Sequence, residues 1–189
     1  MGTVHSLIAP VVGRTSSSRW SESEFRDIFF EHYSRIVGVL MRLLGERSWA
    51  EEIANDAFWR LYCQPASAMN GNVAGWLYRT ATNLGIDTLR ASARRYQYEN
   101  QAGHEGQTNV AGPLEEVLRE ERCRKVREVL GELKPAQAQL LILRASGFSY
   151  NELATALSLN LSGIGTMLNR AEAAFRQRYI EKHGTEEEV

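Results

Sequence analysis

The sequence is poor in cysteine, in proline and in long apolar runs. Its two cysteines, Cys63 and Cys123, lie far apart with no CxxC motif and no histidine pair nearby, which excludes a disulfide framework and a zinc knuckle. No apolar run approaches the roughly 18 residues that a membrane-spanning helix needs, and the short stretch 7–12 follows no basic leader. We therefore expect a reduced, cytoplasmic protein that does not insert into a membrane.

An excess of charge of either sign is also missing. The 189 residues include 22 Lys and Arg against 23 Asp and Glu, a formal net charge of −1, so the chain as a whole does not attract nucleic acid. Binding to nucleic acid would have to come from a local arrangement of charge. Because 43% of the residues are apolar, the chain can bury a core, and its length fits one domain or two small ones.

The chain shows no strand-like alternation of apolar and polar residues, and most of it has the apolar spacing of amphipathic helices. The first strong pattern starts at Phe25 and is closed by Gly45. The second pattern opens at Ser48, for which Glu51 would complete a capping box, and Pro65 ends it. These signals predict two consecutive amphipathic helices.

A third helix is predicted from about residues 73–76 to about residue 95, after which the apolar periodicity vanishes among Gly, Gln, Asn and Glu. Helical spacing returns after residue 113, and Pro135 is predicted to start a new, shorter helix within this part of the chain. The sequence therefore predicts an all-α fold, with two small helical domains joined by a flexible linker. The predicted segments are a flexible N-terminal arm (1–23), a first helical domain (24–95), the linker (96–113), a second helical domain (114–183) and an acidic tail (184–189).

The second domain ends in a short helix, a tight turn and a longer helix. Ser149 and Glu152 form a capping box that opens the short helix, and Leu157 ends it. The longer helix follows a turn at residues 158–160. This order is typical of a helix-turn-helix, whose second helix enters the major groove of DNA. A plain helical hairpin that holds a small core fits the same spacing.

The third predicted helix carries a local excess of positive charge, because residues 76–95 contain four arginines and one aspartate. At about 100° per residue, one sector of this helix holds Arg79, Asn83, Asp87, Arg90 and Arg94. Guanidinium groups neutralise phosphates, and flanking aromatic residues such as Trp76 and Tyr78 can stack on unpaired bases. This face therefore favours binding to single-stranded or melting DNA. A solvated helix face, with aromatic residues that serve packing, is the alternative.

The second predicted helix carries acidic and amide residues beside its apolar face, namely Glu51, Glu52, Asn55 and Asp56. Carboxylates near the start of a helix complement its dipole, and the same cluster also suits a basic partner surface. No histidine or lysine converges on it, and glycine-rich phosphate loops, nucleophile elbows and HExxH spacing are missing from the sequence. We therefore expect a binding protein with no catalytic site, no metal and no cofactor.

Three stretches carry a resemblance to a known family. They are residues 50–62 (AEEIANDAFWRLY), residues 76–90 (WLYRTATNLGIDTLR) and residues 133–175. In this order they resemble the extracytoplasmic-function (ECF) sigma factors of the sigma-70 superfamily, which direct bacterial RNA polymerase to promoters. Several spaced motifs in one order make the match more specific than any one motif, and with the linker they cover about residues 24–182.

The resemblance implies a sigma factor that binds core RNA polymerase and promoter DNA. It assigns four residues to the clamp helices of the largest polymerase subunit: Glu51, Glu52, Asn55 and Asp56. It assigns five residues to the melting strands of the −10 element: Arg79, Asn83, Arg90, Arg94 and Arg95. The loop 64–75 would hold a base flipped from the −10 element, and the linker would thread toward the active-site and RNA-exit region of the polymerase.

The same resemblance implies that the helix-turn-helix lies in the −35 major groove and touches the polymerase flap, and that an anti-sigma factor restrains the protein. One stretch departs from the family, because residues 160–169 carry no charge where members have a Lys- and Arg-rich recognition helix. Contacts to DNA are left to Ser162, Thr166, Asn169 and Arg170. Two alternatives stay open: a sigma-like adaptor that does not select promoters itself, and a repressor that binds duplex DNA without polymerase.

Overall fold

The computed structural model describes residues 20–101 and 114–184. The predicted N-terminal arm, most of the linker and the acidic tail lie outside these ranges. Every regular element among the described residues is a helix, which confirms the all-α prediction. In chain order the elements are α1 (Glu22–Leu44), α2 (Arg47–Cys63), the 3-10 turn η1 (Ala66–Met69), α3 (Val73–Gln101), α4 (Leu114–Glu132), α5 (Pro135–Ala145), α6 (Tyr150–Leu157), the 3-10 turn η2 (Leu161–Gly163) and α7 (Ile164–His183).

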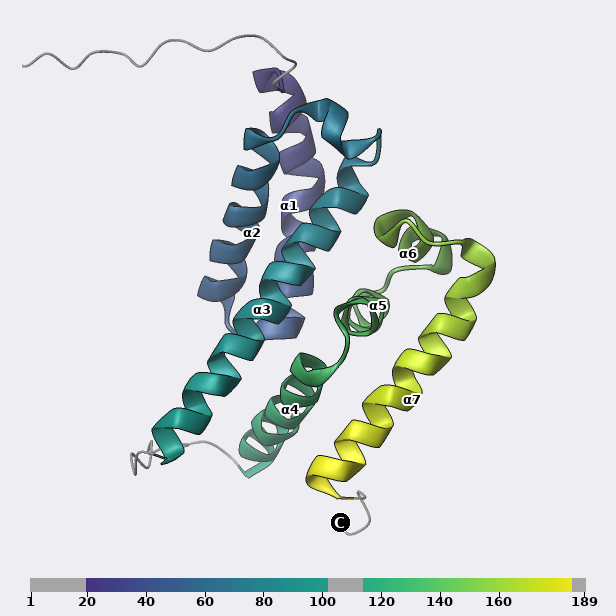
Figure 1. Ribbon diagram of the computed structural model, residues 1–189. Helices are drawn as coiled ribbons and strands as arrows, with labels where there is room; N and C mark the ends of the chain where they lie inside the picture. The colour runs from purple at the N-terminus through teal and green to yellow at the C-terminus, as the bar shows by residue number, and fades with distance from the viewer. Residues whose placement is uncertain (1–19, 102–113, 185–189) are drawn as a thin grey trace, which may run out of the picture.

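The first domain is a bundle of α1, α2 and α3 (Figure 1). α1 begins with a capping box at Ser21 and is closed by Gly45, whose φ of +84° lies in the left-handed region that glycine favours. Leu40 and Leu43 of α1 are fully buried between the helices. Gly85 lets α3 approach α1 closely, because a Cβ at this position would lie 2.7 Å from the Leu43 side chain and 2.9 Å from that of Leu40.

Two helix boundaries differ from the predictions. Ser48 does not cap α2, because this helix starts at Arg47 with Glu46 as its N-cap residue, and the Ser48 hydroxyl donates to the Glu46 carboxylate. Since Gly45 already closes α1, only Glu46 remains extended between the two helices. α3 continues past its predicted end at residue 95 to Gln101, because Arg, Gln and Glu favour helix even without an apolar stripe.

The second domain consists of α4 to α7. Pro135 starts α5, and the capping box of Ser149 and Glu152 starts α6, as predicted. After α6 the chain turns through Ser158, with a φ of +54°, and then through η2. α6 and α7 form the predicted helix-turn-helix, and the fully buried Ile164 anchors the first turn of α7 in the core.

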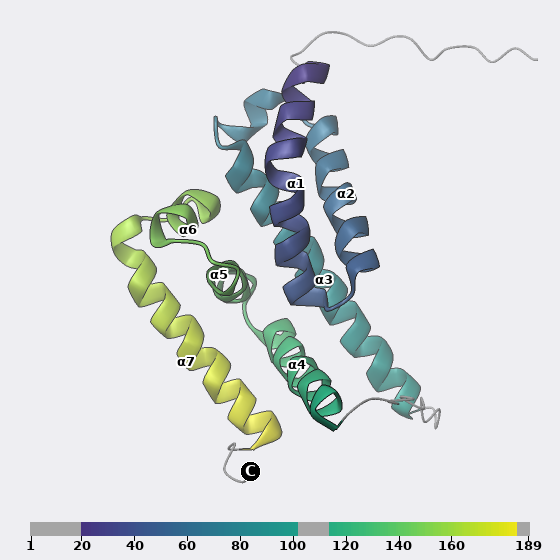
Figure 2. The same cartoon turned by 180° about the vertical axis from the view of Figure 1, so that it is seen from behind.

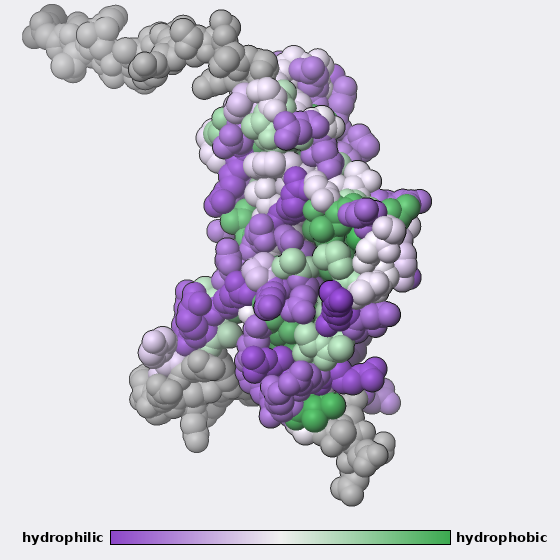
Figure 3. Space-filling model, turned by 45° about the vertical axis from the view of Figure 1, so that its right-hand side comes forward, coloured by the Kyte–Doolittle hydropathy of each residue, from purple (hydrophilic) through white to green (hydrophobic). Residues whose placement is uncertain are grey.

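The two domains lie side by side, and α4, α5 and α6 all pack against α3 (Figures 1 and 2). α7 is the outermost helix of the second domain and packs on α4, α5 and α6. On the face shown in Figure 3 the surface is mostly hydrophilic, and apolar residues appear in separate patches. In the described part of the chain, no helix has the length and apolarity to cross a bilayer.

Candidate nucleic-acid interface

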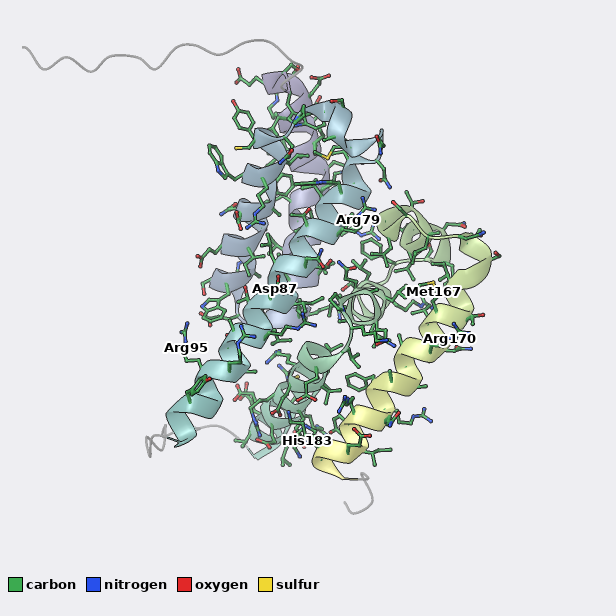
Figure 4. The ribbon with its side chains drawn as sticks, viewed as in Figure 1. Arg79, Asp87, Arg95, Met167, Arg170 and His183 are labelled. Carbon is green, nitrogen blue, oxygen red and sulfur yellow. The ribbon has the colours of Figure 1, made fainter. Side chains whose placement is uncertain are left out.

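The five residues of α3 that are predicted to face DNA lie on more than one side of the helix. Asn72 caps the start of α3 by accepting the backbone N–H of Gly75 at 2.8 Å. Arg79 lies on the side that faces α6, whereas Arg95 points away from the second domain (Figure 4). Sixteen positions along an ideal helix correspond to a rotation of about 160°, so these two arginines cannot share one face.

Arg79 is engaged with the end of α6. Its Nη1 donates to the carbonyl oxygen of Ala156 at 3.1 Å and to Oγ of Ser158 at 2.6 Å. The last carbonyls of a helix have no partner within the helix and carry partial negative charge, so a guanidinium stabilises them. Part of the hydrogen-bonding capacity of Arg79 is therefore used inside the protein.

Arg90 holds the end of α4 in the same manner. Its Nε donates to the carbonyl oxygen of Gly131 at 2.8 Å, and its Nη2 donates to that of Leu133 at 2.9 Å. Asp87 is the acid beside it, with its carboxylate 3.7 Å from Nη1 of Arg90. Backbone carbonyls of the second domain, rather than a carboxylate, are thus the close partners of this arginine.

Asn83 belongs to a polar cluster that joins the two domains. Gln139 of α5 is 7% exposed, and its amide donates to Oδ1 of Asn83 at 2.9 Å and to Oγ1 of Thr82 at 3.0 Å. Thr82 is fully buried and donates to the carbonyl oxygen of Tyr78 at 2.6 Å. Tyr78 is itself buried against Phe148 of the second domain, with ring centroids 4.9 Å apart. This tyrosine serves packing, so it is not a platform for bases.

Arg94 and Arg95 are exposed on the part of α3 beyond these contacts. Among the described residues, neither has a hydrogen-bonding or ionic partner. In this arrangement they are the arginines of α3 whose guanidinium groups are ready to meet a phosphate.

A cleft of about 560 Å³ opens between α2 and α3 beside Asn83. Trp59 of α2 and Trp76 of α3 line it, and Trp59 is 64% exposed and stacks on Tyr62 with ring centroids 5.9 Å apart. The predicted base-holding loop contributes only Gln64 to the lining of this cleft. Trp59 was not among the binding residues predicted from the sequence. A large aromatic residue outside the apolar stripe of this helix can nevertheless indicate a binding surface.

The four residues that are predicted to bind polymerase lie on the outer side of α2, away from its buried alanines: Glu51, Glu52, Asn55 and Asp56. Glu51 accepts from Arg47 at 2.7 Å, and Asp56 pairs with Arg60 at 3.1 Å. Surface ion pairs of this kind contribute about 0.5 kcal/mol or less, so a basic partner can replace them.

The four residues that are predicted to bind DNA from the second domain are all exposed: Ser162, Thr166, Asn169 and Arg170. Asn160 orients the first of them, because its Oδ1 accepts both the backbone N–H and the hydroxyl of Ser162. Figure 4 shows Arg170 on α7, on the opposite side of the second domain from α3. This surface remains open while much of the α3 surface is covered.

The described residues hold no candidate metal centre, because no three His, Cys, Asp or Glu side chains among them lie close enough to share an ion. Cys63 and Cys123 are both free and exposed. The interface is built from guanidinium groups, amides and tryptophans, which is the chemistry of binding rather than of bond cleavage.

Comparisons with known proteins match both domains. Residues 28–95 match the profile of Sigma-70 region 2, and residues 123–175 match that of Sigma-70, region 4. The chain is 26% identical over 161 residues to the ECF RNA polymerase sigma factor SigE of Mycolicibacterium smegmatis, which covers 82% of this chain and 61% of that protein. It is 28% identical over 167 residues to the ECF RNA polymerase sigma factor SigW of Bacillus subtilis, covering 83% and 89%. A solved structure of the sigma factor RpoE in complex with the anti-sigma factor NepR, from Bartonella quintana, aligns with a TM-score of 0.48 at 18% identity, covering 85% of this chain and 99% of that one.

Proposed function

The chain belongs to the ECF sigma factors of the sigma-70 family, which direct transcription initiation by RNA polymerase, and we propose that its cleft between α2 and α3 binds an unstacked base of the −10 element. The first domain is region 2 and the second domain is region 4. The observation that carries the proposal is the pairing of an exposed Trp59 with Trp76 across a cleft that Asn83 borders.

The chemistry of the cleft suits a base that has left the duplex. Removing a base from its stack costs a few kcal/mol, and an aromatic surface in a pocket offsets part of that cost. Trp59 and Trp76 supply such surfaces, while Asn83 and Asp87 place an amide and a carboxylate at the same cleft for the edge of the base. The exposed Arg94 and Arg95 would hold phosphates next to the bound strand.

Sigma factors bind core RNA polymerase, and we assign the contact with the clamp helices of the largest subunit to the outer side of α2. Its support is an acidic and amide group in which Glu52 and Asn55 are exposed, while the half-buried Glu51 and Asp56 make only local, weak ion pairs. The contact of region 4 with the flap, the path of the linker and the anti-sigma partner stay predictions from the resemblance.

We assign recognition of the −35 element to η2 and the start of α7, through Ser162, Thr166, Asn169 and Arg170. The support is the exposure of Ser162 in the turn and of the other three residues on the second helix of a helix-turn-helix. Because only Arg170 is charged, this surface would read base edges and phosphates mainly through neutral hydrogen bonds. We expect duplex binding by region 4 alone to be weak.

Promoter melting by reconstituted polymerase tests the cleft. Core polymerase carrying this sigma factor is first used to select a promoter from a randomised library, and melting is then followed by permanganate reactivity of −10 thymines. Trp59→Ala should lower promoter melting by about 1–3 kcal/mol, the usual contribution of one base stacked on an aromatic side chain. Phe30→Ala is the matched control, because Phe30 is 74% exposed on α1 and does not line the cleft.

Binding to core polymerase is measured separately, so that loss of melting and loss of docking are distinguished. Glu52→Lys should weaken core binding, whereas Glu120→Lys makes the same charge change on the exposed side of α4 and should not. If wild type and Trp59→Ala melt the promoter equally while both are fully bound to core polymerase, the cleft does not bind the unstacked base.

A further inference from the structure

A second cavity, of about 490 Å³, lies where the carboxyl-terminal half of α3 meets α4 and the end of α7. None of the residues around it borders the cleft beside Asn83, so the two cavities are separate. Its volume lies in the range of about 300–1,000 Å³ that is usual for small-molecule sites. Five cationic side chains surround it: Arg90, Arg94, Arg124, Arg127 and Lys182. We call this cavity the basic pocket.

The packing of the two domains fixes the walls of the basic pocket. Ile86 of α3 and Leu130 of α4 are buried in one core that both domains share. Arg90 donates to two carbonyl oxygens at the end of α4, and Arg35 of α1 pairs with Glu152 of α6 at 2.6 Å. A site whose walls are held in place before the ligand arrives loses little free energy to rearrangement on binding.

Positive charge dominates the basic pocket. Two carboxylates, those of Glu128 and Glu132, accompany the five cations, which leaves an excess of three positive charges in a chain whose net charge is −1. Lys182 pairs with both carboxylates, at 2.9 Å from that of Glu128. Since the two acids are paired with this lysine, the excess charge belongs to the four arginines. The pocket therefore attracts anions.

Arg127 is the cation of the basic pocket that most lacks an acceptor. It is half-buried, and among the described residues it makes no hydrogen bond or ion pair, so that its buried Nε has no partner. Burial removes water from a charged donor, which costs free energy when no acceptor replaces the water. On the α3 wall, the exposed Arg94 also has no partner within the described ranges. An anion in the pocket would compensate both guanidinium groups.

The remaining walls of the basic pocket are apolar. Leu89 and Ala93 line it from α3 and Gly131 lines it from α4, where a Cβ would contact the Leu89 side chain at 3.7 Å. A flat apolar body can pack on such walls, and guanidinium planes also stack on aromatic rings. Arginine binds phosphate oxygens in a bidentate manner, so phosphate groups suit the charged part of the same pocket. A flat body joined to phosphate groups is the chemistry of a nucleotide.

We propose that the basic pocket binds a free nucleotide that carries two or three phosphate groups. The phosphates lie at Arg94 and Arg127, and the base packs on the wall formed by Leu89 and Ala93. This site goes beyond the proposed −10 contact, because it shares only Arg90 and Arg94 with the residues predicted to bind DNA and does not need the cleft between α2 and α3. The phosphorylated end of a nucleic-acid strand has the same chemistry, so the experiment compares the two sources.

Isothermal titration calorimetry of the full chain tests this site, with ATP, GTP and pyrophosphate as probes in the absence of magnesium. At least one nucleotide should bind one-to-one with a Kd below about 1 mM, and pyrophosphate, which has no base, should bind more weakly. Arg127→Gln should weaken nucleotide binding about tenfold, the loss expected for one charge-assisted hydrogen bond. Arg122→Gln makes the same change at an exposed residue of α4 that does not line the pocket, and its Kd should stay within about twofold of wild type.

A second pair of variants separates binding inside the pocket from general attraction to a basic surface. Ala93→Phe keeps every charge but places a ring in the pocket, so it should lower nucleotide affinity by about tenfold or more. Ala91→Phe places the same ring at an exposed position of α3 outside the pocket and should bind as wild type does. Thermal unfolding of each variant shows that it is folded, and Arg127→Gln should not lower Tm because Arg127 has no described partner to lose.

The outcomes that overturn the proposal are specific. They are no binding of either nucleotide by wild type, equal Kd values for Arg127→Gln and Arg122→Gln, equal Kd values for the two phenylalanine variants, or equal affinity for pyrophosphate and the nucleotides. A short single strand with a 5′-phosphate is the last probe. If it binds with the same dependence on Arg127 while ATP and GTP do not bind, the pocket holds a strand end and the proposal of a free nucleotide is wrong.

Discussion

Replacement of Arg90 by alanine should destabilise the free protein far more than the same change one turn away at Arg94. Arg90 makes two hydrogen bonds from a charged donor, to the carbonyl oxygens of Gly131 and Leu133. Hydrogen bonds of this kind contribute about 1.5–3 kcal/mol each when sheltered. The Arg90 side chain is 30% exposed and its pair with Asp87 is long, so water competes for part of this energy. We expect a loss of about 2 kcal/mol.

Thermal unfolding followed by circular dichroism measures this difference. For a chain of this size, about 2 kcal/mol corresponds to a fall of roughly 4–8 °C in Tm. Arg94→Ala removes the same side chain from the same helix where it has no partner among the described residues, so it should change stability by no more than about 0.5 kcal/mol. Arg90→Lys should recover only part of the loss, because an ammonium cannot reach both carbonyls with a planar fork. Equal Tm values for Arg90→Ala and Arg94→Ala would show that the carbonyls at the end of α4 are not partners of Arg90 in solution.

Two further predictions concern the same packed state. Burial lowers the pKa of His32 in the folded protein below its value in the unfolded chain. The stability that depends on the neutral His32 side chain is therefore complete above about pH 6.5 and is lost as the pH falls through the folded-state pKa. The Tm of wild type should drop between pH 7.5 and pH 5.5, and the Tm of His32→Gln should drop less. Gly45→Ala and Gly147→Ala both place a side chain at positive φ, at a cost of about 1–2 kcal/mol, but only at Gly45 would the new Cβ overlap the Arg127 guanidinium of region 4. In an Arg127→Ala background the two glycine variants should therefore become equally destabilised in urea titrations, and a persistent extra cost at Gly45 would contradict this contact.

Local signals made most of the helices predictable. The glycine at 45, the proline at 135 and the capping box of Ser149 and Glu152 act within a few residues, and each marks the helix end or start at which it was expected. The error at Ser48 also has a local cause. Gly45, which ends α1, lies only three residues before Ser48, and α2 begins at Arg47 directly after the single extended residue Glu46. Helical periodicity and capping depend on residues that lie a few positions apart, so both can be recognised in a single sequence.

The packing of the second domain against α3 could not be predicted from the sequence. A helical wheel places Arg79 and Arg90 opposite the apolar residues of this helix. This position predicts that their face contacts solvent or DNA. Helical periodicity cannot distinguish a polar face that meets water from one that meets the carbonyl ends of other helices, because both require hydrogen-bonding side chains. Gln139 and Arg35 were missed for the same reason, since their partners lie 56 and 117 positions away along the chain.

The packing of the two domains lowers the number of α3 arginines that are available to contact nucleic acid in this arrangement. Nonspecific binding to single strands is electrostatic, and each phosphate contact adds about 0.7 to the slope of log affinity against log salt. With Arg79 and Arg90 turned to the carbonyls of region 4, only Arg94 and Arg95 of α3 remain to make such contacts in the free protein. The neutral start of α7 adds few more. We therefore expect the salt dependence of single-strand binding by the free protein to fall on Arg94→Ala or Arg95→Ala and to change little on Arg79→Ala or Arg90→Ala.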